Sequence, residues 1–173
     1  MPHAADLPPS AWVERWAPLV PRGRVLDLAC GSGRHARFFV ARGQQVVAVD
    51  RDPQDIPGAR FLRADLEDGS PWPLPGERFE GIVVTNYLHR PLFPRIAEAL
   101  APGGLLVYET FMLGNEKYGR PSNPAFLLAP GELRQAFGQL AEMGFEEGFV
   151  DSPKPAMIQR LCAMRVPRST MAD

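Results

Sequence analysis

Glycine and acidic residues follow or interrupt several apolar runs of the sequence, at spacings that suit a nucleotide-like ligand. Residues 31–36 read GSGRHA and fit the pattern G-x-G-x-x-G/A, in which a glycine-rich turn opens a helix. Asp50 lies 19 residues after Gly31, where a carboxylate can accept hydrogen bonds from both hydroxyls of a ribose. Asp27 lies within the first apolar run and Asp65 ends the third. Together these residues predict a site for a nucleotide-like ligand.

The same acids bear on the charge of that ligand. A pyrophosphate at a helix N-terminus is favoured by donors and positive potential around it. The carboxylate of Asp27 works against a pyrophosphate and favours a ligand that carries positive charge. Asp65 is placed to accept a hydrogen bond from an adenine amino group. The pattern therefore favours a cationic nucleoside over a dinucleotide.

Strand and helix patterns alternate along the chain, and they must position these residues. Apolar runs predict strands at residues 24–30, 44–50, 60–65, 79–88, 105–111, 145–152 and 157–166. Helical patterns predict helices at residues 10–20, 34–42, 91–100 and 131–143, with Ser10 as the first N-cap. We expect an α/β fold: a Rossmann-like, doubly wound, mostly parallel sheet of seven strands in a three-layer α/β/α arrangement. The loop between the last two strands is too short for a crossover helix, which predicts an antiparallel C-terminal strand pair.

Ligands of such sheets bind beyond the carboxyl ends of the strands, so the residues that follow strands are the candidate site. Residues 27–33, 50, 65, 86–90 and 108–110 meet this condition. Trp12 and Trp16 are expected to pack against the sheet, the alternative being that one of them covers the cleft. Arg34 and His35 begin a helix and are expected on the surface.

Length and composition predict one globular domain over residues 1–173, with a Pro-rich segment at 1–9 expected to be frayed. The net charge of −1 gives no sign of a basic nucleic-acid surface, although a local patch stays open. No apolar run approaches the roughly 18 residues that span a bilayer, and the start of the chain has no signal-peptide pattern. Two cysteines without metal-type spacing predict no metal and a reduced, cytoplasmic protein.

Four motifs resemble those of class I S-adenosylmethionine-dependent methyltransferases, over roughly residues 22–166. They are LDLACGSGRHARFF at 26–39, VVAVDRD at 46–52, FLRADLED at 61–68 and LAPGGLLVYETF at 100–111. The acid after the third strand and the Pro-Gly-Gly turn are more specific than the glycine turn. The chain loosely resembles the small tellurite-resistance type of this family.

The resemblance implies S-adenosylmethionine as cofactor and assigns roles to residues of this chain. It places Asp27, Gly31 and Gly33 around the methionine part of the cofactor and Asp50 at the ribose. Asp65 and the backbone of Leu66 would meet the adenine, and Asn86 with Tyr87 would line the floor beneath the methyl group. Ala29, where many members have glycine, and Arg51 complete the implied cofactor set.

The acceptor side of the site is less clearly indicated. His89 is the candidate base by position and by its near-neutral pKa, the alternative being a cap of the next helix. Tyr87 and Glu109 complete the candidate catalytic set, and Tyr108, Glu109 and Thr110 leave the fifth strand toward the same cleft. The long loop at residues 112–130 is expected to close over the acceptor, with Tyr108 and the loop residues Lys117, Tyr118 and Arg120 as candidate contacts.

The departure of Asn86-Tyr87-Leu88-His89 from the Asn-Pro-Pro-Tyr pattern weighs against an amide or adenine acceptor. A small-molecule acceptor is favoured, and an RNA acceptor is the alternative. A non-catalytic S-adenosylmethionine-binding protein and a NAD-dependent oxidoreductase stay open as other classes. A monomer or a homodimer is compatible with the sequence.

Overall fold

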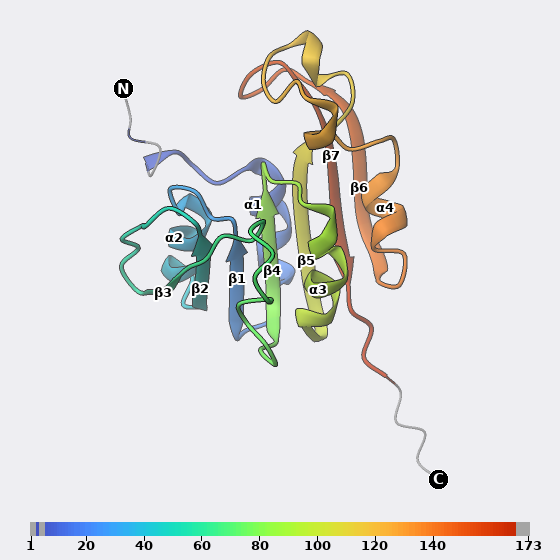
Figure 1. The fold of residues 1–173 in the computed structure, drawn as a ribbon. Coiled ribbons are helices and arrows are strands. Elements are labelled where there is room, and N and C mark those ends of the chain that lie inside the picture. The colour runs from blue at the N-terminus through green and yellow to red at the C-terminus, as the bar shows by residue number, and fades with distance from the viewer. Residues whose placement is uncertain (1–2, 4–5, 169–173) are drawn as a thin grey trace.

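The computed structural model describes residue 3 and residues 6–168, and a single sheet organises them. Its strand order is β3-β2-β1-β4-β5-β7-β6, and Figure 1 shows the strands side by side. The strands are β1 (Arg24–Leu28), β2 (Gln45–Asp50), β3 (Ala59–Arg63), β4 (Phe79–Thr85), β5 (Leu100–Phe111), β6 (Ala141–Val150) and β7 (Ala156–Met164). The first five pair in parallel, and β7 is antiparallel to both β5 and β6. The predicted fold class is confirmed, including the antiparallel C-terminal pair.

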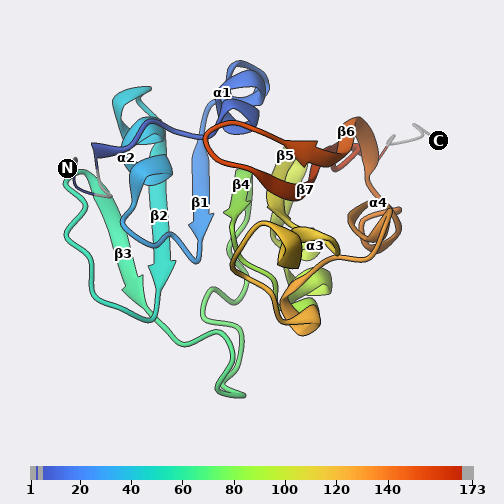
Figure 2. The same ribbon diagram turned by 90° about the horizontal axis from the view of Figure 1, so that it is seen from above.

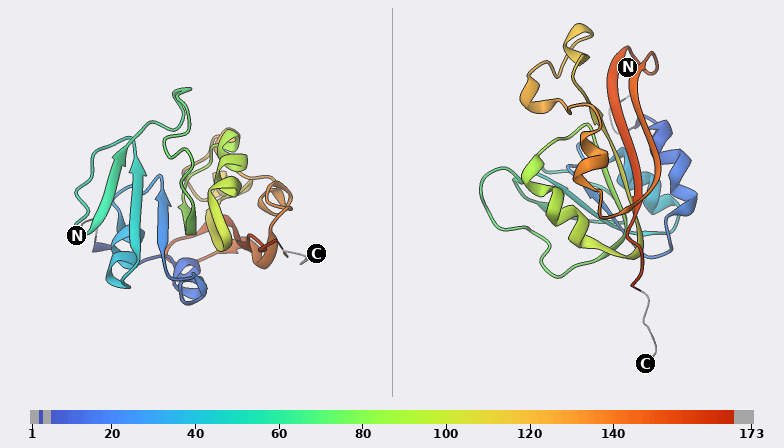
Figure 3. Two further views of the ribbon diagram at one scale, coloured as in Figure 1. Left: turned by 90° about the horizontal axis from the view of Figure 1, so that it is seen from below. Right: turned by 90° about the vertical axis from the view of Figure 1, so that its right-hand side faces the viewer.

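Two pairs of helices cover the two faces of the sheet. They are α1 (Ala11–Trp16), α2 (Arg34–Ala41), α3 (Phe93–Ala99) and α4 (Glu132–Ala136). Successive strand residues point to opposite faces, so Leu26 and Tyr108 belong to the cluster beneath α3 and α4, and Val25 and Val107 to the cluster beneath α1 and α2. The right-hand view of Figure 3 shows the sheet between the two helix layers.

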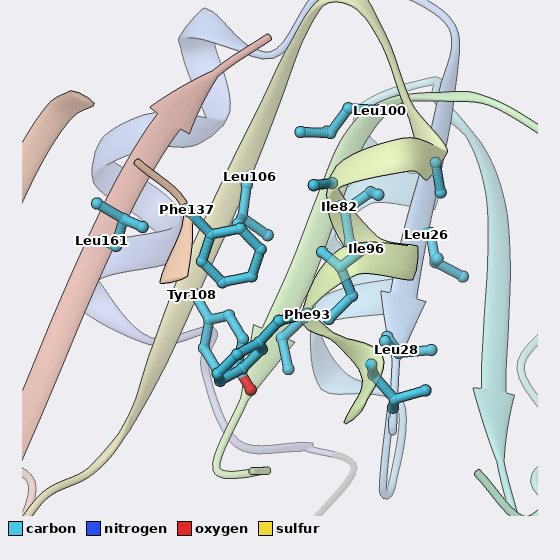
Figure 4. Packing of buried hydrophobic residues seen from close by; sticks show 14 of the residues in the cluster. Leu26, Leu28, Ile82, Phe93, Ile96, Leu100, Leu106, Tyr108, Phe137 and Leu161 are labelled. Carbon is cyan, nitrogen blue, oxygen red and sulfur yellow. The ribbon is translucent and has the colours of Figure 1, made fainter. Parts of the chain in front are cut away.

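The core beneath α3 and α4 is mostly aliphatic and contains a cluster of three aromatic rings (Figure 4). The rings of Phe93 and Phe137 pack edge to face with their centroids 5.2 Å apart. Tyr108 lies 6.1 Å from each of them and is 1% exposed. Its hydroxyl donates to the backbone carbonyl of Tyr87 at 2.8 Å, which ties β5 to the segment that follows β4.

The N-terminal helix confirms the prediction from Ser10, whose hydroxyl accepts a hydrogen bond from the backbone N–H of Val13 at 3.2 Å. A 3-10 turn at Ala17–Leu19 continues it. Trp12 and Trp16 are buried against the sheet, and the indole N–H of Trp12 donates to the carbonyl of Leu161. The tryptophans are therefore packing residues and neither covers the cleft.

The predicted helix at 131–143 is wrong in its extent. The structure ends α4 at Ala136, and β6 begins at Ala141, where it pairs with Met164. Long-range pairing with β7 outweighs the helical pattern of this short segment, because local propensity is a weak prior against tertiary contacts. β6 is an edge strand whose exposed residues include the adjacent pairs 142–143 and 146–147, so its sequence lacks the alternation that marks a half-buried strand.

The segment 112–130 is anchored and contains two 3-10 turns, Asn115–Lys117 and Pro124–Phe126. Asn115 is 2% exposed; its amide N–H donates to the carbonyl of Pro121 and its oxygen accepts from the N–H of Met157, both at 3.0 Å. In Figures 1 and 3 this segment rises beside the tip of the β6–β7 hairpin.

Within the predicted frayed segment 1–9, residues 1–2 and 4–5 lie outside the described residues. Arg34 donates to the carbonyl of Pro8 at 2.9 Å, so the end of this segment is held against α2. Among the helices that the structure describes, none is both long enough and apolar enough to cross a membrane.

Candidate functional site

The carboxyl ends of the parallel strands open into a cavity of about 670 Å³. Figure 2 views the molecule from this edge. One part of the cavity, here the turn half, is formed by the turns after β1, β2 and β3; its residues are Ala29, Gly31, Asp50, Arg51, Asp52, Ala64, Asp65, Leu66 and Glu67. The other part, here the loop half, follows β4 and β5; its residues are Asn86, Tyr87, Leu88, Thr110, Phe111, Pro121 and Phe126.

Asp50 organises the turn half. One of its carboxylate oxygens accepts a hydrogen bond from the N–H of Gly31 at 2.9 Å, and the other accepts from the N–H of Asp52 at 3.0 Å. Gly31 has a φ of +54°, and a Cβ there would meet nothing within 4 Å. Gly33 has a φ of +84°, and a Cβ would lie 2.6 Å from Cδ1 of Ile56. The turn thus needs glycine for its backbone at both positions and for packing at Gly33.

Carboxylates outnumber cations around the turn half. Asp65 accepts a hydrogen bond from the N–H of Glu67 at 2.9 Å, which fixes the turn after β3. The acids that line the cavity are Asp50, Asp52, Asp65 and Glu67, and Arg51 is the basic residue among the lining. These carboxylates accept hydrogen bonds, so they suit hydroxyl, amino and cationic groups and are poorly suited to a pyrophosphate.

Asp27 supports the glycine turn from beneath and does not line the cavity. It is 1% exposed, and its carboxylate accepts a hydrogen bond from the N–H of Ala36 at 2.9 Å. Burial raises its pKa to about 7, against the opposing effect of that hydrogen bond. Its position at the N-terminus of α2 satisfies one of the N–H groups that the first helical turn leaves unpaired.

His35 is buried, in contrast to the surface position expected from the sequence. It is 2% exposed, and its Nε2 accepts a hydrogen bond from the N–H of Ser10 at 3.0 Å. Its Nδ1 lies 3.3 Å from the hydroxyl of Thr85. Burial lowers the pKa of His35 to about 3, so the ring is neutral at pH 7. His35 fastens the N-terminal segment to the end of β4.

The loop half contains residues that the sequence did not single out. Asn86 and Tyr87 lie there as expected, and Asn86 adopts a φ of +54° with its N–H donating to the carbonyl of Glu109. Phe111, Pro121 and Phe126 were missed, because a loop that comes back over a cavity has no local pattern in the sequence. The proline and aromatic residues within the segment 111–126 were the feature of the sequence that could have indicated a wall of the cavity.

Two of the three candidate catalytic residues, Tyr87 and His89, lie near the same acid, Glu67, and the third, Glu109, lies apart. Tyr87 lines the cavity, and burial together with the negative charge of Glu67 raises its pKa. His89 lines a neighbouring hollow of about 950 Å³, with its Nδ1 3.7 Å from Glu67. Glu109 is 9% exposed and forms an ion pair with Arg160, outside both hollows.

The four candidate acceptor contacts also lie elsewhere. Tyr108 is in the core, and Lys117 and Arg120 are exposed residues outside the cavity lining. The ring of Tyr118 packs against Phe149 of β6, with centroids 5.1 Å apart. The segment 112–130 contributes Pro121 and Phe126 to the cavity instead.

Arg90 holds the part of that segment which reaches the cavity. Its guanidinium donates to the carbonyls of Ala125 and Leu127 at 3.0 and 2.9 Å, on either side of Phe126. Two of its nitrogens also donate to Glu132 of α4, at 2.6 and 2.9 Å. The planar guanidinium can serve all four acceptors at once, which a lysine cannot.

Comparison with known proteins identifies the family. The family model described as "Methyltransferase domain" matches residues 2–153. The chain belongs to this methyltransferase family. A trans-aconitate 2-methyltransferase from Methylobacterium nodulans is 34% identical over 112 residues, covering 58% of this chain and 43% of that protein. A ribosomal protein L11 methyltransferase from Thermus thermophilus is 38% identical over 99 residues, covering 50% and 37%. The chain spans less than half the length of these curated relatives.

Solved methyltransferases share the fold. TehB from Haemophilus influenzae superposes with a TM-score of 0.71 at 16% identity, covering 89% of this chain and 61% of that one. The 1,6-didemethyltoxoflavin-N1-methyltransferase from Burkholderia thailandensis, solved with its acceptor and S-adenosylhomocysteine bound, gives 0.65 at 20% identity, covering 90% and 76%. The predicted resemblance to class I methyltransferases, including the tellurite-resistance type, is confirmed at the level of family and fold.

Proposed function

We propose that this methyltransferase domain binds S-adenosylmethionine in the cavity and transfers its methyl group to a small-molecule acceptor. The observation that carries the proposal is the acid-lined turn half, at the carboxyl ends of β1–β3 and directly beside an uncharged loop half. Ligands of parallel sheets bind at this edge. A cavity of about 670 Å³ also suits two small molecules side by side better than a macromolecular surface.

The lining residues fit the cofactor. The open space beside Gly31 leaves room for the methionine part, and Asp27 holds the turn in place through α2. The carboxylate of Asp50 would accept from the ribose hydroxyls, and Asp65 with the backbone of Leu66 would meet the adenine. The cofactor carries net positive charge, which the surrounding carboxylates favour. When bound, it supplies a methyl group on a sulfonium, an electrophile with a good leaving group.

The task of the protein is then alignment rather than proton chemistry. Holding two reactants in line can supply about 7–11 kcal/mol of the barrier. Asn86 and Tyr87 would form the floor of the reaction space, and Thr110, Phe111 and Phe126 its walls. These walls exclude water and orient the acceptor. Tyr87 keeps its proton because its pKa is raised, so it can donate a hydrogen bond but is not a base.

Trans-aconitate is a second candidate for the methyl acceptor, because several relatives are named as trans-aconitate methyltransferases. The aligned part covers less than half of those proteins, so their acceptor contacts need not be present here. We further propose a single-domain cytoplasmic protein, monomeric or homodimeric. Its two cysteines are buried free thiols, which suits a reducing compartment.

Calorimetric titration of the protein with S-adenosylmethionine, S-adenosylhomocysteine and NADH tests the proposal. We expect micromolar binding of the first two and none of NADH. Asp50→Ala should weaken both by about 10–100-fold, since hydrogen bonds to a charged group contribute about 1.5–3 kcal/mol. Asp55→Ala, an exposed acid outside the cavity lining, is the matched control. Binding of NADH alone would replace the proposal with a dinucleotide enzyme.

A further inference from the structure

The loop half of the cavity offers no cation to an anionic acceptor. Its residues, all within the described part of the chain, are apolar or uncharged, and the acids of the turn half lie next to them. Arg90 is the cationic residue that supports this half, and its guanidinium is already hydrogen-bonded to Glu132 and to the carbonyls of Ala125 and Leu127. Lys117 and Arg120 lie outside the lining. A di- or tricarboxylate placed here would lose its hydration, gain no side-chain cation from the loop half and lie beside the acids of the turn half, which is costly.

An aromatic ring is held rigidly at the same place. Phe126 lines the cavity and is 48% exposed, and the carbonyls on either side of it accept from Arg90. Leu127 and Leu128 follow it and are buried at 1% and 0%. An exposed ring on a backbone that is anchored on both sides is a preformed apolar wall. Such a wall is best matched by a flat ligand, because ring faces bury large areas and stack in offset or edge-on geometries.

The loop half, as described, has no histidine or carboxylate of its own among its lining residues; the acids of the cavity belong to the turn half, where Asp50 and Asp65 already accept backbone hydrogen bonds. His89 lies in the neighbouring hollow beside Glu67, and Glu109 is paired with Arg160. Tyr87 lines the cavity but keeps its proton, because burial and the nearby Glu67 raise its pKa. A general base is dispensable only if the attacking atom already carries a free lone pair. An acceptor atom that already carries a free lone pair therefore suits the loop half best.

We infer that the acceptor is an uncharged, planar small molecule that lies against Phe126, and that Arg90 is the positioning residue for this ring. The inference rests on the proposed function. The lone pair of a nitrogen or sulfur atom of the acceptor forms the bond to the methyl carbon. The carbon–sulfur bond breaks, its electron pair stays on the sulfur, and the positive charge passes to the acceptor. If the methylated atom, or a ring nitrogen conjugated to it, carries a hydrogen, that proton is then lost to water; otherwise the product keeps the positive charge.

A panel of probes separates charge from shape. Pyridine-2-thione and quinoline are uncharged and planar, tetrahydrothiophene is uncharged but not planar, and trans-aconitate and citrate are polyanions. Binding is measured by thermal shift of the protein loaded with S-adenosylhomocysteine, and transfer by the S-adenosylhomocysteine formed. We expect a shift with the planar uncharged probes alone, transfer to at least one of them, and a KM that does not change with ionic strength.

Variants test the ring and its support. Phe126→Ala should raise the acceptor KM roughly tenfold, Phe126→Tyr should keep it, and S-adenosylmethionine affinity should stay within about twofold in both. Arg90→Ala and Arg90→Lys should both reproduce the effect of Phe126→Ala, since lysine cannot replace the planar donor set. Phe149→Ala is the matched control for an exposed ring, and Arg134→Ala is the control for an exposed ion-paired arginine.

The outcomes divide cleanly. A wild-type protein that does not bind S-adenosylmethionine overturns the proposed function and the inference with it. A protein that binds the cofactor but methylates trans-aconitate, or binds none of the planar probes, overturns the inference alone. So does a Phe126→Ala variant whose acceptor KM is unchanged. The wild-type protein with the probe panel separates these outcomes even if a variant at Arg90 fails to fold.

Discussion

The turn half and the loop half of the cavity are built in different ways. In the turn half, Asp50 bonds to residues 2 and 19 positions away, and Asp65 to a residue 2 positions away. In the loop half, bonds that join Arg90 to Ala125, Asn115 to Met157 and Arg160 to Glu109 span 35, 42 and 51 positions, although Asn115 also bonds to Pro121 only 6 positions away. The contrast shows that a site for a shared cofactor can be encoded in short motifs. The wall that meets the acceptor depends on distant parts of the chain.

The largest effect should follow from breaking the buried ion pair beside the loop half. Glu109→Ala removes the nearer carboxylate partner of Arg160 and leaves Glu146, 3.3 Å from the guanidinium, as the remaining one; the side chains of Glu109 and Arg160 are 12% and 18% exposed. Removing one member of a buried pair costs about 3–5 kcal/mol, and because Glu146 remains we expect a loss near the lower end of that range. Urea unfolding should show this loss. A Glu109→Leu/Arg160→Leu double variant should recover most of it and keep methyl transfer, whereas a catalytic Glu109 would leave the double variant stable and inactive.

The buried acid under the turn half predicts a pH dependence. The pKa of Asp27 rises from 3.8 to about 7 on folding, so between these values the folded chain binds a proton that the unfolded chain has lost. Through this group, the free energy of unfolding falls as pH rises from about 4 to 7, by up to about 1.4 kcal/mol per pH unit. Asp27→Asn should therefore gain stability relative to wild type across that range. If urea unfolding gave the same difference in free energy of unfolding between Asp27→Asn and wild type at every pH from 4 to 7, this prediction would be contradicted.

His35 predicts a pH dependence of stability with the opposite sign, and it therefore serves as the control for Asp27. Its pKa falls from 6.5 to about 3 on folding, so the unfolded chain binds the extra proton between these values. Stability through His35 should rise with pH over that range and be fully present above it. His35→Gln should lose this rise when unfolding is followed by circular dichroism at a series of pH values.

Asn115 tests whether long-range bonds hold the loop half. Asn115→Ala removes two hydrogen bonds and leaves the N–H of Met157 unpaired, which should cost about 1–3 kcal/mol. It should also raise the acceptor KM and leave cofactor affinity unchanged. Asn123→Ala removes a bond to a residue two positions away on the exposed surface and should cost less. Equal losses in thermal unfolding would mean that the segment is held locally.

The two glycines sharpen the description of the turn half. Alanine at either position is strained by a positive φ, which costs about 1 kcal/mol. Gly33→Ala should lower stability by more than this strain alone, because its methyl would meet Ile56. Gly31→Ala should lose little stability beyond the strain, because its methyl enters open cavity space. That methyl should instead impair cofactor binding. Calorimetry and thermal unfolding on both variants separate the two effects. Full cofactor affinity in Gly31→Ala would place the cofactor elsewhere.

The smallest effect is expected at the two exposed cations of the segment 112–130. Lys117→Ala/Arg120→Ala should change stability by less than about 0.5 kcal/mol and leave the acceptor KM unchanged, because neither residue lines the cavity. A clear rise in KM would restore the hypothesis that these side chains contact an anionic acceptor.

Much of the fold and of the turn half could be predicted. Apolar strands that end in Asp50 and Asp65 and a glycine turn before α2 carry their own local pattern. The helix at 131–143, the surface position of His35 and the roles of His89 and Glu109 were predicted from neighbours in sequence alone. In each case where the structure differs, the partner that decides the position is distant: β7 for the end of α4, Ser10 for His35, and Arg160 for Glu109.

The sequence by itself determined the class of fold, the family and the residues suited to a cationic nucleoside, because strand periodicity, turn glycines and strand-end acids are local signals. Only the tertiary structure decided that Asp27 lies under the turn, that Arg90 holds Phe126 at the cavity, and that the candidate bases lie apart. The physical reason is that side-chain burial and ion pairing are decided by whichever distant segment packs nearby, and the pattern of neighbouring residues does not carry that information.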